Sequence, residues 1–168
     1  MKILQQITQV FVWLARAGAG LAFLVLICAV LVQVVGRTIG NSPVWTEELT
    51  RYALLYLVAF GGGLALRSGD MVNVDVFSEN LPGRGPWMLR FFSAVATLGL
   101  TVYLLAPAWK YVSIGRMQTS PALGLRMTYV HFTVWLLLVV LAVAALVRIA
   151  GMIAGTDDGT PEKKPEEA

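Results

Sequence analysis

Three charged residues at the start of a long apolar segment have types and spacing that could do chemistry. Glu47 lies four residues before Arg51 and Glu48 lies three before it, so a helix would bring all three side chains close together. The group could be a solvated helix end that contributes only about 0.3–0.5 kcal/mol. It could instead face charged groups of a partner protein, because charges at membrane depth need protein or water around them. These residues alone leave both interpretations open.

The sequence lacks the residue groups that haem, metal and acid–base chemistry require. His131 is the only histidine and Cys28 the only cysteine. A bis-histidine haem needs two histidines, and a redox or metal motif needs paired cysteines. We therefore predict a protein that is not an enzyme and has no cofactor of its own. His131 is expected to be a hydrogen-bonded residue near a helix end, and Cys28 a packing residue.

The composition is that of an integral membrane protein. The chain has 168 residues, of which 57% are hydrophobic and 14% are charged, and its mean hydropathy is +0.71. Charged residues make up about a quarter of an ordinary soluble domain. The formal net charge of +3 is spread along the chain without a basic run. We therefore expect contact with membrane lipids and no binding to nucleic acid.

Four uncharged runs are long enough to cross a bilayer. We predict transmembrane helices near residues 17–36, 44–67, 88–109 and 127–148. Pro107 is expected to mark the frayed end of the third helix. Apolar residues run almost all round each helix, so we expect tilted, splayed helices rather than a closed dry bundle. The predicted fold class is an all-α membrane protein with one four-helix domain over residues 1–150 and a disordered cytoplasmic tail over residues 151–168.

Two further segments are expected to lie at the membrane surface. Residues 1–16 fit an interfacial helical lead-in, for which a signal peptide is the competing interpretation. Residues 71–86 fit a short interfacial helix that contains Val74, Asp75 and Phe77. The alternation of valines in the same segment fits a short strand equally well.

The second span has a capped start and an unusual glycine run. Ser42 suits the N-cap position and Pro43 the first helical position. Each glycine of residues 61–63 costs about 1 kcal/mol in a helix relative to alanine. Close packing against another helix would compensate for that cost. Local unwinding that exposes backbone carbonyls, as at transporter ion sites, is the rival interpretation.

A few small and polar residues inside the spans are candidates for contacts between helices. Gly18 and Ala22 form a small-xxx-small pair that would let another helix approach closely. Gln33, Ser93 and Thr97 are candidates for hydrogen bonds from one helix to another. Lysine and arginine placement favours cytoplasmic N and C termini, with eight basic residues on that side and five on the other.

Several motifs together resemble one family of membrane proteins. They are Arg37 after the first span, W-T-E-E-L-T-R-Y from Trp45, the glycine-rich middle of the second span, R-S-G-D-M-V-N-V-D-V-F, N-L-P before the third span and S-P-A-L-G-L. This pattern, over roughly residues 17–148, resembles the small membrane subunit of tripartite ATP-independent periplasmic (TRAP) transporters, the DctQ-like family.

The resemblance implies a non-catalytic small permease subunit in a bacterial inner membrane. It implies a large multi-span subunit that moves an organic acid or similar solute with sodium, and a periplasmic binding protein that delivers the solute. Sodium is thus expected on the large partner and not on this chain, which would act as a scaffold. The expected partner-interface residues are Arg37, Trp45, Glu47, Glu48, Arg51, Gly61, Gly62 and Gly63.

A stand-alone membrane protein is the alternative from a different class. Four spans without a binding site could still form a small channel or carrier as a homo-oligomer. The two hypotheses differ in whether the chain needs a much larger membrane partner.

Overall fold

A computed structural model describes residues 2–41, 43–68 and 85–155 of the chain. They form the helices α1 (Lys2–Thr38), α2 (Trp45–Ser68), α4 (Gly85–Ile114) and α5 (Thr128–Ile153), with a short 3₁₀ turn, η1 (Gly115–Met117), after α4. These described ranges contain no strand, only an isolated antiparallel bridge between Thr119 and Arg126. All four helices are long and apolar enough to cross a membrane. The predicted all-α fold with four spans is confirmed.

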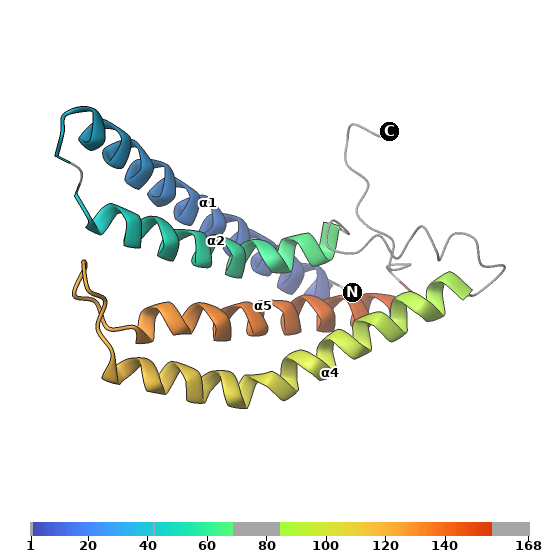
Figure 1. Ribbon diagram of the computed structural model, residues 1–168. Coiled ribbons are helices and arrows are strands. Elements are labelled where there is room, and N and C mark those ends of the chain that lie inside the picture. Colours follow the sequence, from blue (N-terminus) through green and yellow to red (C-terminus); the bar gives the residue numbers. More distant parts are fainter. Residues whose placement is uncertain (1, 42, 69–84, 156–168) are drawn as a thin grey trace.

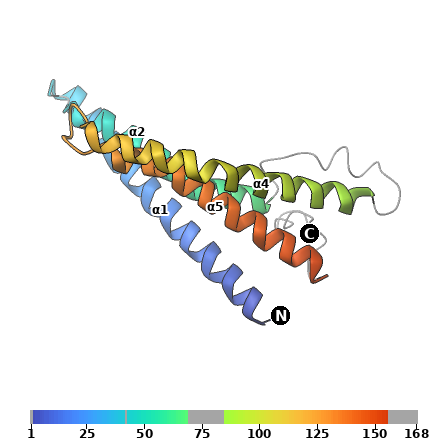
Figure 2. The same ribbon diagram turned by 90° about the horizontal axis from the view of Figure 1, so that it is seen from below.

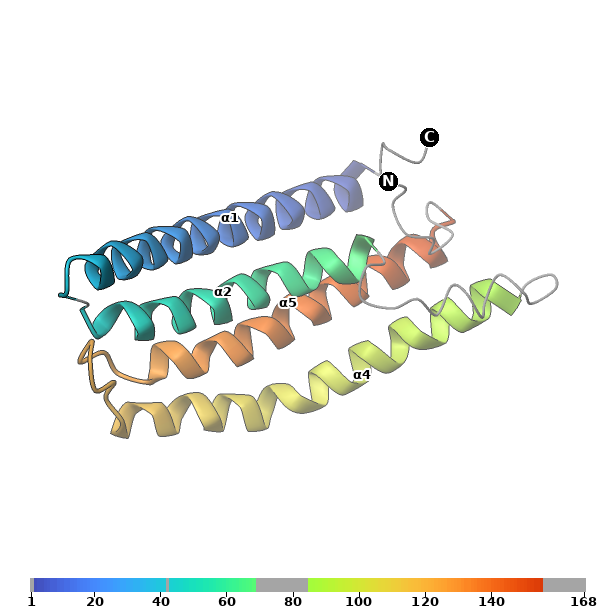
Figure 3. The same cartoon turned by 45° about the horizontal axis from the view of Figure 1, so that its top comes forward.

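The helices lie side by side in the order α1, α2, α5, α4 (Figures 1 and 3). Two hairpins, α1–α2 and α4–α5, meet where α2 packs on α5. The described residues that connect the helices of each hairpin, 39–41 with 43–44 and 115–127, lie at the same end of the molecule, which we call the loop end. Figure 2 shows α1 diverging from α5 toward its N-terminal end. In the most apolar part of each helix, 33% of α5 is buried but only 11% of α1, so α1 is an outer helix.

Small residues at seven-residue intervals form the contacts of the two outer helices. On α1 the buried residues Ala15, Ala22 and Ala29 follow this spacing. On α4 the buried Ala94, Thr101 and Ala108 do the same. The hydroxyl of Thr101 donates to the Thr97 carbonyl of its own helix, at 2.8 Å, so its burial leaves no polar group unpaired. A seven-residue repeat keeps one face of a helix against its neighbour, and small side chains let the two backbones come close.

The expected close approach at Gly18 is confirmed. A Cβ atom at this position would lie 2.7 Å from the ring of Phe60 on α2. Such a distance is well inside van der Waals contact, so the Phe60 ring occupies the space that a side chain would fill. Ala22, one turn further along α1, is buried as well.

Three helix boundaries differ from those predicted. α1 runs without a break through Ala17, where the first span was expected to begin. Neither a proline nor a capping group interrupts it there. The residues expected to form a separate lead-in are therefore the first part of α1. α4 continues past Pro107 to Ile114, so the prediction of a frayed end at Pro107 is wrong. α5 extends beyond residue 150 to Ile153.

The course of α4 shows how a proline can lie inside a span. Pro107 lacks an N–H group, so one carbonyl of the preceding turn loses its helical hydrogen bond. Helices in membranes tolerate this loss where neighbouring groups and local adjustments satisfy the carbonyl. α4 is visibly curved along its length (Figure 1). The helix therefore bends but does not end.

Candidate functional site

At the loop end, Glu47 forms polar contacts between α1 and α2. Its carboxylate oxygen Oε1 lies 3.1 Å from the Arg37 guanidinium and accepts a second hydrogen bond from Gln33 Nε2 at 3.4 Å. Both donors come from α1, so these bonds join α1 to α2. Glu47 therefore pairs with Arg37 across the hairpin and not with Arg51 along its own helix. The Gln33 bond confirms the expected interhelical role of that residue.

Glu48 faces in the opposite direction and holds the connection between α4 and α5. Its oxygen Oε2 accepts hydrogen bonds from the Ser120 hydroxyl, from the Ala122 N–H at 3.2 Å and from the Leu123 N–H at 3.0 Å. Ser120 is buried, with 3% of its surface exposed. One carboxylate thus satisfies three donors of a tight turn about 70 residues away in the sequence. We call this arrangement the Glu48 clamp.

The clamped turn has its own backbone bonds. The Ser120 N–H donates to the Leu125 carbonyl at 2.8 Å, and the Gly124 N–H donates to the Ser120 carbonyl at 3.0 Å. Gly124 adopts a φ of +64°, a left-handed conformation that favours glycine. The turn is therefore locally organised, and Glu48 fixes it against the start of α2.

Two tyrosines extend the contact of Glu48 along the same face of α2. Tyr52 and Tyr56 follow Glu48 at four-residue intervals. The Tyr56 hydroxyl donates to the Tyr129 carbonyl at 2.8 Å, and the Tyr52 hydroxyl lies 3.6 Å from the sulfur of Met127. Sequence analysis singled out neither tyrosine, although residues at i, i+4 and i+8 share one helix face and gave a usable signal.

His131 joins α5 to α4 near the same end. Its Nδ1 lies 3.0 Å from the Tyr111 carbonyl, and the His131 and Tyr111 rings stack with centroids 3.9 Å apart. The side chain is 6% exposed. The expectation of a hydrogen-bonded histidine near a helix end is confirmed.

The glycine run of α2 lies in unbroken helix, so the interpretation as local unwinding is wrong. A Cβ atom on Gly63 would lie 2.3 Å from the Val140 side chain, and one on Gly62 would lie 2.8 Å from Leu137. Both contacts are with α5. Gly61 would meet nothing within 4 Å. Close packing therefore explains Gly62 and Gly63 but not Gly61.

The remaining predicted residues have varied environments. Trp45 and Arg51 are exposed at the loop end. Thr97 donates to the Ser93 carbonyl of its own helix, so the expected bond from Thr97 to another helix is not formed. Val74, Asp75 and Phe77 lie outside the described residues, as does Ser42. α2 begins at Trp45 and not at Pro43, and the fully buried Thr46 donates its hydroxyl to the Pro43 carbonyl at 2.7 Å.

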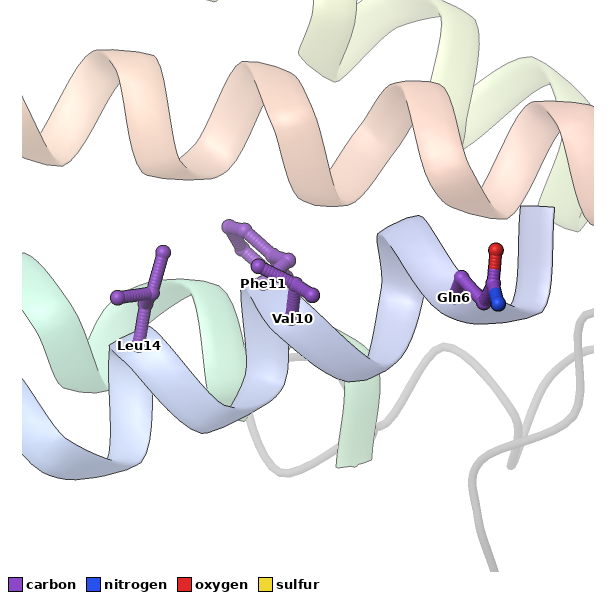
Figure 4. A pocket seen from close by; sticks show the side chains of 4 residues that line it. All are labelled: Gln6, Val10, Phe11 and Leu14. Atoms are coloured by element: carbon purple, nitrogen blue, oxygen red, sulfur yellow. The ribbon is translucent and has the colours of Figure 1, made fainter. Parts of the chain in front are cut away.

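Two hollows on the described surface have mostly apolar linings. One of about 390 Å³ is lined by Gln6, Val10, Phe11 and Leu14. Figure 4 shows these four side chains on the side of α1 that faces α5 in this view. No group of three or more metal-ligating side chains occurs within residues 2–41, 43–68 and 85–155. The polar side chains described above for the loop end form hydrogen bonds that join one helix or turn to another.

Comparison with known proteins gives one matching family and two relatives. Residues 26–155 match the family model described as "Tripartite ATP-independent periplasmic transporters, DctQ component". A Haemophilus influenzae protein provisionally named a TRAP transporter small permease protein is 28% identical over 104 residues. The sialic acid TRAP transporter small permease protein SiaQ of Vibrio cholerae is 24% identical over 107 residues.

These relatives are matched over part of their length. The alignments cover 61% and 62% of this chain, and 65% and 62% of the respective relatives. The chain therefore spans just under two thirds of the curated relatives that it matches. The family match is broader and includes the loop end, α2, α4 and α5.

Proposed function

This chain belongs to the DctQ component family of tripartite ATP-independent periplasmic transporters, and from that premise we propose that it supports a large membrane subunit during solute uptake. Subunits of this family are non-catalytic permeases, so the chain is not an enzyme. It is a multi-pass membrane protein. The proposed role is a scaffold that steadies the subunit through which the solute moves.

The open row of helices is the observation that carries this proposal. Both outer helices carry large exposed apolar side chains along their spans, including Leu24 and Leu31 on α1 and Phe92 and Leu100 on α4. At the loop end both carboxylates are bonded within the chain. The described part of the chain therefore offers broad apolar surfaces to a membrane partner and to lipid.

Solute and sodium would bind to the partners. We propose an organic acid or similar solute, delivered by a periplasmic binding protein and coupled to sodium on the large subunit. One relative is named for sialic acid transport, which agrees with that class of solute. The proposed location is a bacterial inner membrane with both termini in the cytoplasm. The bias of basic residues supports this orientation, which places the loop end on the periplasmic side.

Purification and reconstitution test the proposal. A tagged chain extracted in mild detergent should carry a much larger multi-span membrane protein with it. Proteoliposomes should take up solute only when they contain both membrane proteins, the binding protein is added and a sodium gradient is present. Replacing external sodium by potassium is the matched control and should abolish uptake. A homo-oligomer of this chain that moves solute without a partner would overturn the proposal in favour of a stand-alone carrier.

A further inference from the structure

The hollow lined by Gln6, Val10, Phe11 and Leu14 lies where α1 diverges from α5 (Figures 2 and 4). Val10, Phe11 and Leu14 fall inside the candidate membrane span of α1, Thr8–Thr38, and Gln6 precedes that span by two residues. Val10 and Leu14 stay 57% and 54% exposed, although they lie on the side of α1 that faces α5 in Figure 4. The wedge between the two helices thus presents apolar side chains that the described part of the chain does not cover.

The contacts of Phe11 show how deep in the membrane this wedge lies. A Cβ atom on Gly63 would lie 3.2 Å from Phe11 Cζ and 2.3 Å from the Val140 side chain, so α1, α2 and α5 meet at this level. From Val140 the sequence of α5 stays uncharged as far as Val147, a rise of about 10 Å. Gln6 lies five residues before Phe11, a rise of about 7 Å in the same direction. The hollow therefore opens to hydrocarbon and not to water.

The size and shape of the hollow fit one acyl chain. Its volume is about 390 Å³. From Gln6 to Leu14 the lining covers eight residues of helix, about 12 Å, and one leaflet contributes about half of the roughly 30 Å of hydrocarbon in a bilayer. A transmembrane helix is about 10–12 Å wide with its side chains, which is too wide for a wedge that closes where Phe11 meets Gly63. A slim, flexible chain can enter there.

The polarity of the lining agrees with such an occupant. Gln6 is the only polar residue of the four, and it lies at the outer end, where its amide can donate a hydrogen bond to an ester carbonyl of a lipid. Water would find too few polar partners beside Val10, Phe11 and Leu14 to be held there. An acyl chain instead gives these side chains dispersion contacts. The exposed Arg16 lies on the opposite side of α1, from which its long side chain can extend toward the same headgroups.

We propose that this wedge holds an acyl chain of a phospholipid from the leaflet farther from the loop end. The ester region of the lipid lies beside Gln6, and the chain runs past Val10 toward Leu14 between α1 and α5. The lipid covers the side of α1 that α5 leaves exposed, and so it holds the N-terminal part of α1 in its diverging position. This site needs neither a solute nor a protein partner, so it goes beyond the function proposed above.

Photolabelling of the unmodified chain tests the site. The full chain is placed in phosphatidylcholine vesicles that contain a small fraction of a phosphatidylcholine with a diazirine in the middle of one acyl chain. It is extracted, washed in detergent to remove loosely associated lipid, and illuminated, and mass spectrometry identifies the labelled residues. Label should be concentrated on residues 6–14 of α1 and 140–147 of α5. Absence of retained label, or label spread evenly along α1 as far as Leu24 and Leu31, would overturn the inference.

A substitution that fills the hollow gives a second measurement. Leu14→Trp should retain about threefold less labelled lipid than the unmodified chain, because the indole takes the space in which the acyl chain makes its dispersion contacts. Leu24→Trp is the matched control, because Leu24 is 59% exposed on the same helix but lines neither of the two hollows, and it should retain lipid normally. Circular dichroism checks that both variants fold, and equal retention by the two would contradict the proposal. If Leu14→Trp does not fold, the labelled positions in the unmodified chain decide.

Two further outcomes would assign the hollow to a different occupant and so overturn the inference. Displacement of the label by oleate but not by unlabelled phosphatidylcholine would assign it to a free fatty acid. Loss of the label from residues 6–14 in the complex with a large membrane subunit, together with cross-links from Val10→Cys to that subunit, would assign it to a protein partner. The cross-linking uses a chain with Cys28→Ser, which removes the only native thiol.

Discussion

One face of α2 contacts the second hairpin in two different ways. At the loop end Glu48 and Tyr56 reach across with polar atoms that accept or donate hydrogen bonds. Further along α2, Ala59 is buried, and Gly63 packs directly against Val140 of the second hairpin. The contact thus turns from hydrogen bonds to packing of small residues within about four turns of α2.

The difference separates two structural tasks. Hydrogen bonds are directional, so those at the loop end fix which residues of the two hairpins face each other. Packing of small residues sets how closely the helices approach, and in a membrane this contact must replace the hydrophobic effect, which lipid removes. We therefore expect mid-span changes to alter the stability of the whole row and loop-end changes to act more locally.

The largest effect is expected from Gly63→Leu. A Cβ atom alone would lie 2.3 Å from Val140 Cγ1 and 3.4 Å from the Val140 carbonyl oxygen, so α2 and α5 must separate. Overpacking of this kind costs about 3 kcal/mol. Unfolding of the purified chain in mixed micelles should show a corresponding loss of stability. Gly61→Leu is the control, because this position meets nothing within 4 Å, and it should be neutral or slightly stabilising. Equal loss in both variants would remove the distinction between packed and open glycines.

The next effect is expected from Glu48→Ala, at the other end of the same face. The change leaves the Ser120 hydroxyl and the N–H groups of Ala122 and Leu123 without their acceptor. Amide hydrogen exchange of residues 118–126 should become faster, while exchange in the middle of α2 changes little. Glu48→Gln should have a smaller effect because its amide oxygen can still accept hydrogen bonds. Unchanged exchange in the turn would mean that Glu48 does not hold it.

Sequence patterns predict the spans better than their contacts. A run of about 20 uncharged residues is a property of each segment alone, so the four helices could be placed without knowledge of their neighbours. The glycines at 62 and 63 also signalled close packing, because their cost within a helix demands compensation. The sequence could not predict in the same way that α4 continues past Pro107. That outcome depends on how the surrounding structure satisfies the carbonyl of the preceding turn, which proline leaves without its helical hydrogen bond.

The acidic pair shows why the candidate site was harder to predict. Spacing of three and four residues places Glu47 and Glu48 near Arg51 on one helix, but it contains no information on residues brought in from other helices. Arg37 reaches Glu47 across the first hairpin, and Ser120 reaches Glu48 from the second. The predicted contact of Trp45, Glu47, Glu48 and Arg51 with a partner protein stays a prediction, with both carboxylates now known to have partners inside the chain.

Tyr56→Phe tests a single bond at the boundary between the two modes of contact. The change removes the hydroxyl that donates to the Tyr129 carbonyl at 2.8 Å and keeps the ring. The expected loss is about 1 kcal/mol, the usual contribution of one hydrogen bond. The same micelle unfolding assay measures it. Tyr103→Phe serves as the control, because that residue is 78% exposed on α4 and should show no loss. Equal losses at the two sites would argue against a stabilising role for the Tyr56 bond.

The smallest effect is expected at Glu47, next in sequence to Glu48. Its pair with Arg37 is exposed, with 43% and 64% of the two side chains accessible, so solvent screens the attraction. Glu47→Gln should therefore cost about 0.2–1 kcal/mol, and a double-mutant cycle with Arg37→Gln should give a coupling energy in the same range. Because Gln33 also donates to Glu47, Gln33→Ala should remove part of that coupling and not add to it. A much larger coupling energy in the isolated chain would place the pair in a water-poor environment. In that case Glu47 and Glu48 would contact different hairpins, but their interactions would stabilise the chain to a similar extent.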